Sequence, residues 1–352
     1  MGEFDLIERY FKRPERTAER SELVKLGIGD DCALLQPRTQ TQLAVSSDML
    51  VQGRHFFADV DPAALGHKAL AVNLSDLAAC GAKPIAFTLA LALPEVNERW
   101  LAAFSQGLFA LADAHGCELV GGDTTRGPLN ICITVFGEVP IVNGQSQALL
   151  RSGAKAGDDV YVSGSLGEAR LALEVMRGNL SLSDDAGEDH FATIRQRLER
   201  PTPRVALGLA LRGIATSAID VSDGLLGDLG HILKGSNVGA SLEIDAFNTM
   251  QLIAYYVDNT WASGKFNLKN AHNQDLSLQN TLIGYIVAGG DDYELAFTAS
   301  PTARAQVQVA AQAAQTPVTR IGHIELEPGL RLVDDSGAIV QHQWHSFDHF
   351  AK

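Results

Sequence analysis

The sequence predicts a protein of the α/β class, built from two α/β domains of similar size. The chain has 352 residues, 46% of them hydrophobic, which is enough for two domains with ordinary cores. Strand-like apolar runs alternate with helix-like segments in both halves of the chain. A polar, turn-rich stretch, residues 141–148, predicts a linker between a domain over residues 1–140 and a second domain over residues 149–352.

The first half of the chain predicts four strands and two helices. Their expected order is strand 43–46, helix 62–80, strand 86–93, helix 97–115, short strand 119–120 and strand 130–139. Asp61 is an expected N-cap of the first helix, and Pro62 suits its first turn. Gly81 followed by Pro84 predicts where that helix ends, and Pro140 predicts the end of the last strand.

The second half repeats the alternation. We expect strand 159–163, helix 168–176, a loop over 179–190, a helix opened by Pro201 and Pro203, strand 217–221, helix 225–234, strand 241–244 and strand 283–288. Residues 258–281 are rich in Asn, Ser, Lys and Gln and predict no element. The turn Gly164–Gly167, between a strand and a helix, has two interpretations: a cradle for phosphate or a plain β→α turn.

The charge balance argues against a nucleic-acid partner. The chain carries 42 acidic and 28 basic residues, a formal net charge of −14. Such a chain repels phosphodiester backbones unless it has a local basic patch, and no Lys/Arg cluster in the sequence would make one. Most of this acidity is expected to serve solubility.

Other features favour a cytoplasmic protein without a membrane span or a zinc site. No stretch reaches the ~18 uninterrupted apolar residues of a membrane span. The first residues, MGEFDLIERYFKR, have the pattern of an amphipathic helix rather than of a signal peptide. The four cysteines are far apart and form no C-x-x-C pair, which favours reduced structural thiols. The histidines show no metal-binding spacing.

Five short patterns place aspartate beside Gly or Ser, mostly at the ends of apolar runs. They are Gly27–Asp31, Ser46–Asp48, Asn73–Asp76, Gly121–Thr125 and Asp220–Gly224. Turn chemistry alone explains one such pattern, because aspartate caps helices and glycine supplies positive φ. Five patterns in one chain indicate a shared role in addition.

Asp76 carries the strongest indication. On the predicted helix 62–80 it falls on the same stripe as Ala69 and Val72, with Asn73 one turn before it. A carboxylate on an apolar face is costly unless it is paired or bound to a metal. Two interpretations remain: a structural pair with Lys68 or an arginine, and a metal ligand.

A set of aspartates without His or Cys points to Mg²⁺, which prefers oxygen ligands. Several Mg²⁺ ions bound by carboxylates suit the handling of polyphosphates, because the metals bridge phosphate oxygens. The common nucleotide motifs, such as G-x-x-x-x-G-K-[ST] and G-x-G-x-x-G, are missing from the sequence. An ATP site would therefore have to use another scaffold.

Nine segments in a fixed order resemble the thiamine-monophosphate kinase family, within a superfamily that includes aminoimidazole ribonucleotide synthetase and selenophosphate synthetase. They are GIGDDCALL (27–35), SSDMLVQGRHF (46–56), HKALAVNLSDLAACGAKP (67–84), GGDTTRGP (121–128), LLRSGAKAGDDVYVSG (149–164), RPTPR (200–204), AIDVSDGLLGDLGHI (218–232), GGDDYELAF (289–297) and FDHF (347–350). The resemblance covers nearly the whole chain. It implies a two-domain PurM-like fold and a homodimer in which the N-terminal sheets join across the two-fold axis.

The resemblance also implies an activity: ATP-dependent phosphorylation of thiamine monophosphate to thiamine diphosphate, the last step of thiamine diphosphate biosynthesis. Transfer would be direct and in line, aided by several Mg²⁺ ions and without a covalent nucleophile. By residue match, the implied Mg²⁺ ligands are Asp30, Ser46, Ser47, Asp48, Asp76, Asp123, Asp220 and Asp223. The implied ATP contacts are Gly122, Asp123, Arg151 and Ser222, and the implied substrate contacts are His55, Asp291 and Phe347.

Two positions depart from the family pattern. Many relatives carry Glu where Asp291 stands, and Trp or Tyr where Phe347 stands; both changes keep the chemical type. Two alternatives to the kinase are a purine-pathway enzyme of the same superfamily and a non-catalytic protein that binds Mg-nucleotide. Selenophosphate synthetase would need a reactive cysteine near the start, whereas Cys32 is interpreted as a packing residue.

Overall fold

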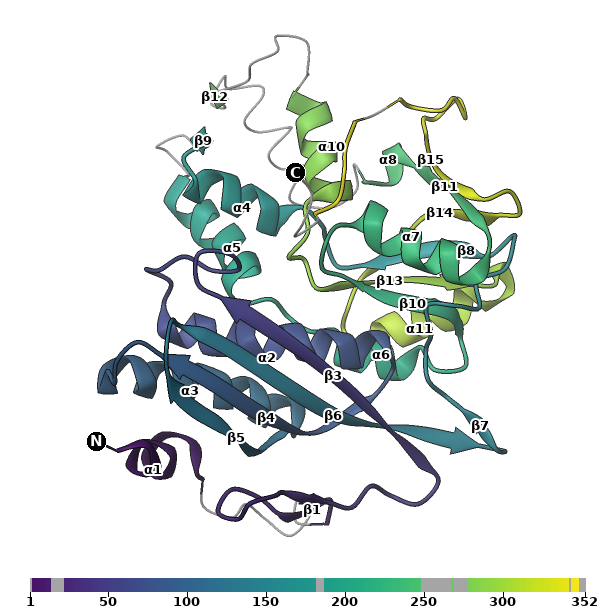
Figure 1. Ribbon diagram of the computed structural model, residues 1–352. Helices are drawn as coiled ribbons and strands as arrows, with labels where there is room; N and C mark the ends of the chain where they lie inside the picture. The colour runs from purple at the N-terminus through teal and green to yellow at the C-terminus, as the bar shows by residue number, and fades with distance from the viewer. Residues whose placement is uncertain are drawn as a thin grey trace. The chain divides into compact units, whose positions relative to one another are not determined.

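The chain folds into two compact α/β units, Met1–Ala148 and Leu149–Lys352, which are described one at a time. The computed structural model describes residues 2–13, 22–181, 187–247, 267–268, 278–341 and 343–347 (Figure 1). Each unit combines one principal β-sheet with helices. The predicted α/β class is therefore confirmed.

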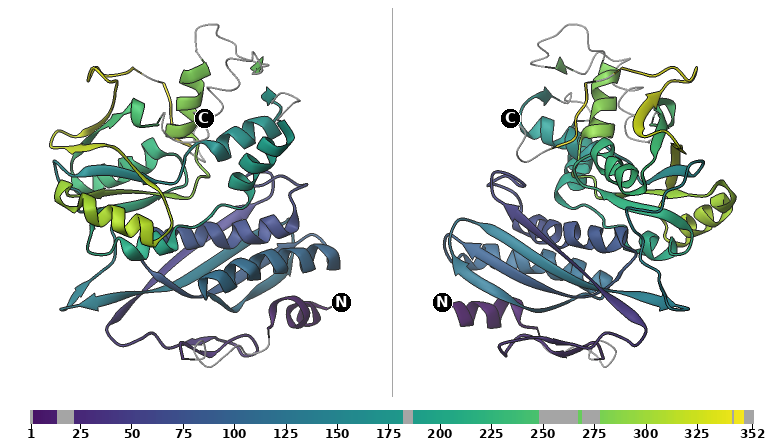
Figure 2. Two further views of the ribbon diagram at one scale, coloured as in Figure 1. Left: turned by 180° about the vertical axis from the view of Figure 1, so that it is seen from behind. Right: turned by 45° about the vertical axis from the view of Figure 1, so that its right-hand side comes forward.

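The first unit is a five-stranded sheet with two long helices packed on one face. The strand order is β3 (Thr41–Val51), β6 (Asn130–Val142), β4 (Lys83–Leu93) and β5 (Glu118–Arg126), and β7 (Gln145–Ser146) pairs with β6. The helices are α2 (Pro62–Ala79) and α3 (Glu98–His115), and Figure 2 shows both on the same side of the sheet. Alternate residues of β6, Ile131, Ile133 and Val135, are buried beneath them, as the two-residue period of a strand requires.

The N-terminal segment packs near the opposite face of this sheet. It begins with α1 (Glu3–Leu6) and a π-helical turn, η1 (Ile7–Phe11). It continues with the two-stranded sheet of β1 (Val24–Leu26) and β2 (Leu34–Leu35). Val24 and Leu35 pack against Ala86 and Val120 of β4 and β5.

The second unit has a six-stranded mixed sheet in the order β10, β13, β8, β14, β11, β15. These strands are β8 (Asp159–Ser163), β10 (Ala215–Val221), β11 (Gly239–Glu243), β13 (Glu294–Ala299), β14 (Val318–Glu325) and β15 (Gly329–Val333). Its main core lies between the sheet and two helices, α7 (Leu225–Ser236) and α10 (Leu278–Ala288). On the other side of the sheet lie α6 (Val205–Ala210) and α11 (Arg304–Ala313), which contact each other (Figure 1).

Smaller elements complete the second unit. They are α4 (Glu168–Met176), α5 (Gly187–Glu199), α8 (Ile244–Phe247), the short 3₁₀ turn η2 (Pro301–Ala303), and a short pair of strands, β9 (Leu180–Ser181) and β12 (Asn267–Leu268). No helix in the described ranges is long and apolar enough to span a membrane.

Elements with clear start and stop signals were predicted closely. The structure confirms strand 159–163 and helix 168–176, and it ends α2 at Ala79, one residue before the predicted end. Asp61 caps α2 as predicted, because its Oδ2 accepts a hydrogen bond from the Ala64 N–H at 2.9 Å. Helix 97–115 is confirmed as α3, with Asn97 as its N-cap.

Three strands of the first unit are longer than predicted. β3 runs through Ser46–Asp48, β5 runs through Gly121–Asp123, and β6 runs past Pro140. The proline is tolerated because the pairing of β6 with β4 has already ended at Glu138, so that no N–H at position 140 is needed for that ladder. Cross-strand pairing thus overrides the local turn signals.

The predicted linker over residues 141–148 is wrong. Ile141 and Val142 end β6 and pair with β7 across a tight hairpin. The two turn residues, Asn143 and Gly144, have φ values of 52° and 78°, which is the geometry of a type I′ turn. The polar composition therefore marks a hairpin turn inside the first unit.

The strand predicted at 283–288 is also wrong, because these residues belong to helix α10. Its buried side chains, Leu282, Ile283, Ile286 and Val287, recur with helical spacing and join the main core. The loop predicted over 179–190 is likewise replaced by β9 and the start of α5, while residues 182–186 lie outside the described ranges. Most of segment 258–281, for which nothing was predicted, also lies outside them.

Candidate functional site

Four polar residues meet where β3 faces α2, and we call them the β3–α2 cluster: Ser46, Asp48, Asn73 and Asp76. The Ser46 hydroxyl donates a hydrogen bond to Asp76 Oδ2 at 2.5 Å. The Asp48 N–H donates to Asn73 Oδ1 at 3.1 Å, while the Asn73 amide donates to the Ala69 carbonyl. Asn73 thus fixes α2 against β3 and brings the predicted ligands Ser46, Asp48 and Asp76 together.

Ser47 lies on the opposite face of β3. Side chains alternate along a strand, and residues 43, 45, 47 and 49 are exposed while residues 44, 46 and 48 are more buried. The Ser47 hydroxyl forms a hydrogen bond with the Thr134 hydroxyl at 2.9 Å and donates to the Ile133 carbonyl. The structure therefore does not bring the Ser47 side chain to the β3–α2 cluster.

A pocket of about 690 Å³ in the first unit brings together Asp30, Gly122 and Asp123. Its walls include the Gly27–Asp31 turn, strands β4 and β5, and apolar residues of the N-terminal segment such as Phe4 and Phe11. Gly122 has φ +148°, and a Cβ at this position would lie 1.8 Å from the Leu89 carbonyl oxygen. Only glycine lets β5 pass this close to β4 and keeps its backbone open at the pocket.

His55 lies in the turn that follows β3. Its Nδ1 accepts a hydrogen bond from the Val51 N–H at 3.0 Å, so a neutral imidazole here carries its proton on Nε2. The main chain of the same turn closes by a bond from the His55 N–H to the Val51 carbonyl at 3.0 Å. In the neutral ring, Nε2 is therefore the donor nitrogen.

In the second unit, four predicted site residues converge on one loop. Residues 222–224 join β10 to α7, and we call them the 222–224 loop. Its Ser222 carbonyl accepts from the Asp291 N–H at 2.7 Å, and its Asp223 carbonyl accepts from the Phe347 N–H at 2.9 Å. Two segments far apart in the sequence, 289–293 and 344–347, therefore dock on this loop beside the predicted ligand Asp223.

The contacts with the 222–224 loop hold Asp291 in a strained backbone conformation, and a hydroxyl anchors the segment 344–347. Asp291 adopts φ +61°, which is uncommon for a residue with a side chain, and Gly290 before it has φ +73°. A Cβ on Gly290 would lie 2.7 Å from the Ser222 carbonyl oxygen, so glycine is required there. The Ser346 hydroxyl accepts from the Gly227 N–H at 2.7 Å and donates to the Gly224 carbonyl at 3.2 Å.

Asp220 and Arg151 are not among the residues that meet at the 222–224 loop. Asp220 lies on β10, is 5% exposed, and faces away from its core neighbours Ile219 and Val221. Arg151 is exposed, and its carbonyl lies near Ser236 at the C-terminal end of α7. The 222–224 loop is at the other end of that helix, so the structure does not bring the Arg151 backbone to Ser222.

Asp228, which the sequence interpretation missed, lies beneath the 222–224 loop. Its Oδ2 accepts hydrogen bonds from the N–H groups of Ser222, Asp223 and Gly224 at 3.0, 3.1 and 3.1 Å. Burial, followed by the charge of Asp223, raises the pKa of Asp228 to about 7, although the three N–H bonds oppose the rise. One signal in the sequence could have indicated Asp228. The predicted helix 225–234 begins after a glycine, which cannot cap it with a side chain, and Asp228 is the acidic residue of its first turn.

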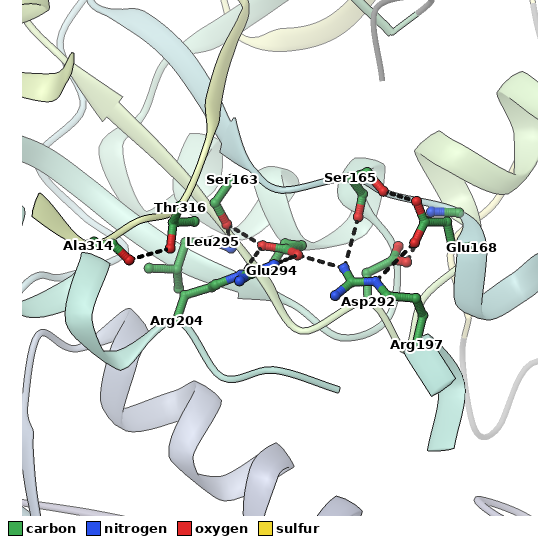
Figure 3. A network of polar contacts seen from close by, with 11 residues as sticks. Ser163, Ser165, Glu168, Arg197, Arg204, Asp292, Glu294, Leu295, Ala314 and Thr316 are labelled. Atoms are coloured by element: carbon green, nitrogen blue, oxygen red, sulfur yellow. Dashed lines mark hydrogen bonds and ion pairs between the residues drawn. The ribbon is translucent and has the colours of Figure 1, made fainter. Parts of the chain in front are cut away.

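A buried network of charges joins β8, β13 and α5 within the second unit (Figure 3). Glu294 is fully buried and accepts from Arg204 Nε at 2.6 Å, Arg197 Nη2 at 2.6 Å and the Ser163 hydroxyl at 2.5 Å. Arg197 also pairs with Glu168 at 3.0 Å. Although burial opposes it, the charges of Glu294 and Glu168 raise the pKa of Arg197.

The same network decides between the two interpretations of the Gly164–Gly167 turn. The Gly167 N–H donates to Asp292 Oδ1 at 3.0 Å, and the Gly164 N–H donates to the Pro317 carbonyl at 2.9 Å. A Cβ on Gly164 would lie 2.1 Å from Glu294 Oε1. These amides are engaged by the protein itself, so the turn is a packed β→α turn rather than a phosphate cradle.

The donor atoms of the predicted metal set suit Mg²⁺. The β3–α2 cluster, Asp30 and Asp123 of the pocket, and the separate residues Asp220 and Asp223 supply carboxylate and hydroxyl oxygens, the ligands of a hard cation. Within the described residues, no group of three or more His, Cys, Asp or Glu side chains lies close enough to hold an ion. Among the described residues, neither unit by itself therefore presents a complete coordination shell of such side chains.

The two halves of the chain match two domain families. Residues 29–139 match the N-terminal domain of AIR synthase related proteins, and residues 155–335 match their C-terminal domain. The fold and its aspartate pairs thus define a two-domain protein of the AIR synthase related class.

Individual relatives narrow this class. Thiamine-monophosphate kinase of Salmonella typhimurium is 45% identical over 99% of this chain and 98% of its own. The crystal structure of thiamine-monophosphate kinase from Stenotrophomonas maltophilia, 44% identical, covers 94% of this chain and 96% of its own with a TM-score of 0.76. AaThiL complexed with AMPPCP and TMP, 27% identical, covers 99% and 97% with a TM-score of 0.70. The chain belongs to the thiamine-monophosphate kinase family, which confirms the resemblance found in the sequence.

Proposed function

We propose that this chain transfers the γ-phosphate of ATP to thiamine monophosphate and forms thiamine diphosphate. The observation that carries the proposal is the 222–224 loop, whose carbonyls hold Asp291 and Phe347 beside Asp223. The proposed substrate contacts Asp291 and Phe347 and the proposed metal ligand Asp223 are thereby positioned by the same loop. The AaThiL complex with AMPPCP and TMP supports the same pair of substrates.

The substrate contacts follow from the chemistry of three side chains. The half-exposed ring of Phe347 stacks on an aromatic ring of thiamine. Asp291 pairs with the cationic or amino-bearing heterocycle through its carboxylate. His55 donates from Nε2 to an oxygen of the substrate.

We propose Gly122 and Asp123, which line the 690 Å³ pocket, as contacts of ATP, and Ser222 and Arg151 as two further contacts. Gly122 lets the backbone approach the phosphates, and Arg151 is a charge-assisted donor to a phosphate oxygen.

Mg²⁺ would be held by Asp30, Ser46, Ser47, Asp48, Asp76, Asp123, Asp220 and Asp223, with the Ser47 side chain as the member that faces away from Ser46 and Asp48. When bound, Mg²⁺ offsets the negative charge of the phosphates. The protein's own part is to position both substrates for in-line transfer. The attacking phosphate has a second pKa of ~6 and is largely ionised at neutral pH, so no strong general base is required.

We also propose that the chain acts as a homodimer through the open face of β3. Leu43, Val45 and Met49 on this face are 43%, 56% and 53% exposed, and β3 is the edge strand of its sheet. Apolar side chains in a row on an edge strand favour an interface. Light scattering should give twice the chain mass, and V45K should shift it towards the monomer; a wild-type monomer would contradict the dimer.

We place the enzyme in the cytoplasm, without a nucleic-acid partner. Cys32 and Cys132 are free thiols, which suits a reducing compartment. The formal net charge of −14 disfavours binding to phosphodiester backbones.

The decisive experiment is a product assay. Purified protein is incubated with MgATP and thiamine monophosphate, and thiamine diphosphate and ADP are measured by chromatography. Equal amounts of both products, lost with EDTA, support the kinase. ATP binding without acceptor-dependent ATP consumption would favour the non-catalytic alternative, and a folded protein that forms no thiamine diphosphate would favour a purine-pathway enzyme.

A further inference from the structure

We propose that Asp228 is a positioning residue that sets the geometry of the 222–224 loop and, through it, the places of Asp223, Asp291 and Phe347. The inference rests on the proposed function for its kinetic consequences. Its structural part, the docking of two distant segments on the loop, stands independently of that function.

The start of α7 supplies the first argument. Helix N-termini leave backbone N–H groups without an intrahelical partner. Gly224, the N-cap of α7, offers no side chain to satisfy them. Asp228, 4% exposed and one turn inside the helix, accepts on a single oxygen from the N–H of Gly224 at the helix start and from the N–H groups of Ser222 and Asp223 in the preceding loop.

Peptide planarity links these bonds to the site. In a trans peptide the N–H of one residue and the C=O of the preceding residue point in opposite directions. The Asp223 N–H, held by Asp228, therefore directs the Ser222 carbonyl towards the Asp291 N–H, which it meets at 2.7 Å. The Gly224 N–H, also held by Asp228, directs the Asp223 carbonyl towards the Phe347 N–H, which it meets at 2.9 Å.

Two adjacent peptide planes are thus each fixed at both ends. Asp228 holds the inner end of each plane, and a substrate-contacting segment docks on the outer end. The carboxylate also occupies the three N–H groups of the loop itself, so these amides are not available to a ligand. What the loop offers to a ligand is therefore the side chains of Ser222 and Asp223 rather than its amides.

The alternative is that Asp228 contributes stability alone. Asp158 is a matched control, because it is 5% exposed and its Oδ2 accepts from the Lys155 N–H at 3.0 Å and the Thr216 hydroxyl at 2.7 Å. It caps backbone in the same unit without touching the 222–224 loop. D158A should lower the melting temperature and leave kcat and KM within twofold of wild type.

The test compares D228A, D228N and D158A at a temperature where each is folded. D228A should lower kcat/KM for thiamine monophosphate by ~100-fold, the scale of a 1 Å misplacement, and should raise KM as well as lower kcat. D228N keeps the shape and a weaker acceptor oxygen, so its loss should be ~10-fold. If D228A does not fold, D228N decides in the same way. The proposal would be overturned if the kcat and KM of D228A or D228N matched those of D158A.

Hydrogen exchange provides a readout that does not need activity. Amides of peptides spanning 289–293 and 344–347 should exchange at least ~10-fold faster in D228A and D228N than in wild type or D158A. Unchanged exchange in these peptides would also overturn the proposal. If the wild-type protein formed no thiamine diphosphate, the proposed function would fail, while the exchange data would still decide whether Asp228 positions the loop.

Discussion

Replacing Glu294 by Gln should destabilise the second unit more than any replacement of an exposed acid. The carboxylate is fully buried and receives two guanidinium groups, those of Arg197 and Arg204, together with the Ser163 hydroxyl. Glutamine has nearly the same shape, but it loses the charge and turns an N–H₂ group towards donors. Both arginines are themselves largely buried, with side chains 21% and 15% exposed.

The expected loss in the free energy of unfolding arises because Arg197 and Arg204 stay buried without the negative charge of Glu294. Removing one partner of a buried ion pair costs about 3–5 kcal/mol, a large part of the 5–15 kcal/mol that a typical domain has. The control is Glu243→Gln, because Glu243 is 44% exposed and pairs with Arg320 at 3.0 Å. An exposed pair of this kind is worth at most about 1 kcal/mol.

Urea unfolding followed by circular dichroism measures both variants against wild type. We expect a lower midpoint for E294Q and a midpoint close to wild type for E243Q, with slopes unchanged. If the free energy of unfolding of E294Q lay within about 1 kcal/mol of that of E243Q, the network of Figure 3 would not be the support described here.

Three further predictions address stability against pH and the proposed site. Hydrogen bonds from Arg304, opposed by burial and aided by Arg320, lower the pKa of Asp159 from 3.8 to about 2. Its contribution of about 2 kcal/mol is present above pH 4 and is lost as the pH falls through 2, so D159N should lose it at pH 7 and show a flatter acid limb in thermal melts. Asp76→Asn should lower kcat by at least ~100-fold and raise the Mg²⁺ concentration for half-maximal rate, and unchanged turnover would argue against its role as a ligand. Phe347→Ala should raise KM for thiamine monophosphate by ~10-fold; a change in the KM for ATP alone would refute the stacking role.

Local signals were sufficient to predict part of the fold. Asp61 with Pro62, and Asn97 further along, mark helix starts that depend only on neighbouring residues. The extra length of β3, β5 and β6 depends on their partners across the sheet, which no local pattern contains. Helix α10 was mistaken for a strand because a short apolar run fits a buried helix and a buried strand equally well.

The candidate site was predictable in composition but not in arrangement. The acids were recognised by residue type and by resemblance, and the structure brings Ser46 to Asp76 and brings Asp291 and Phe347 to the 222–224 loop. Asp228 was missed because its partners are backbone N–H groups of residues 222–224, and only its place in the first turn of a helix without a side-chain cap indicates it. The position of Arg151 at the far end of α7 depends on tertiary packing.

In the segment 344–347, the groups that hold the segment in place differ from the group proposed to contact the substrate. Residues 346 and 347 are held by a hydroxyl and a main-chain N–H, whereas the ring at 347 remains half-exposed and takes no part in those two bonds. A different aromatic side chain at position 347 would keep the same main-chain hydrogen bond to the Asp223 carbonyl. A change of the ring at position 347 could therefore alter the preference for the acceptor substrate without undocking the segment.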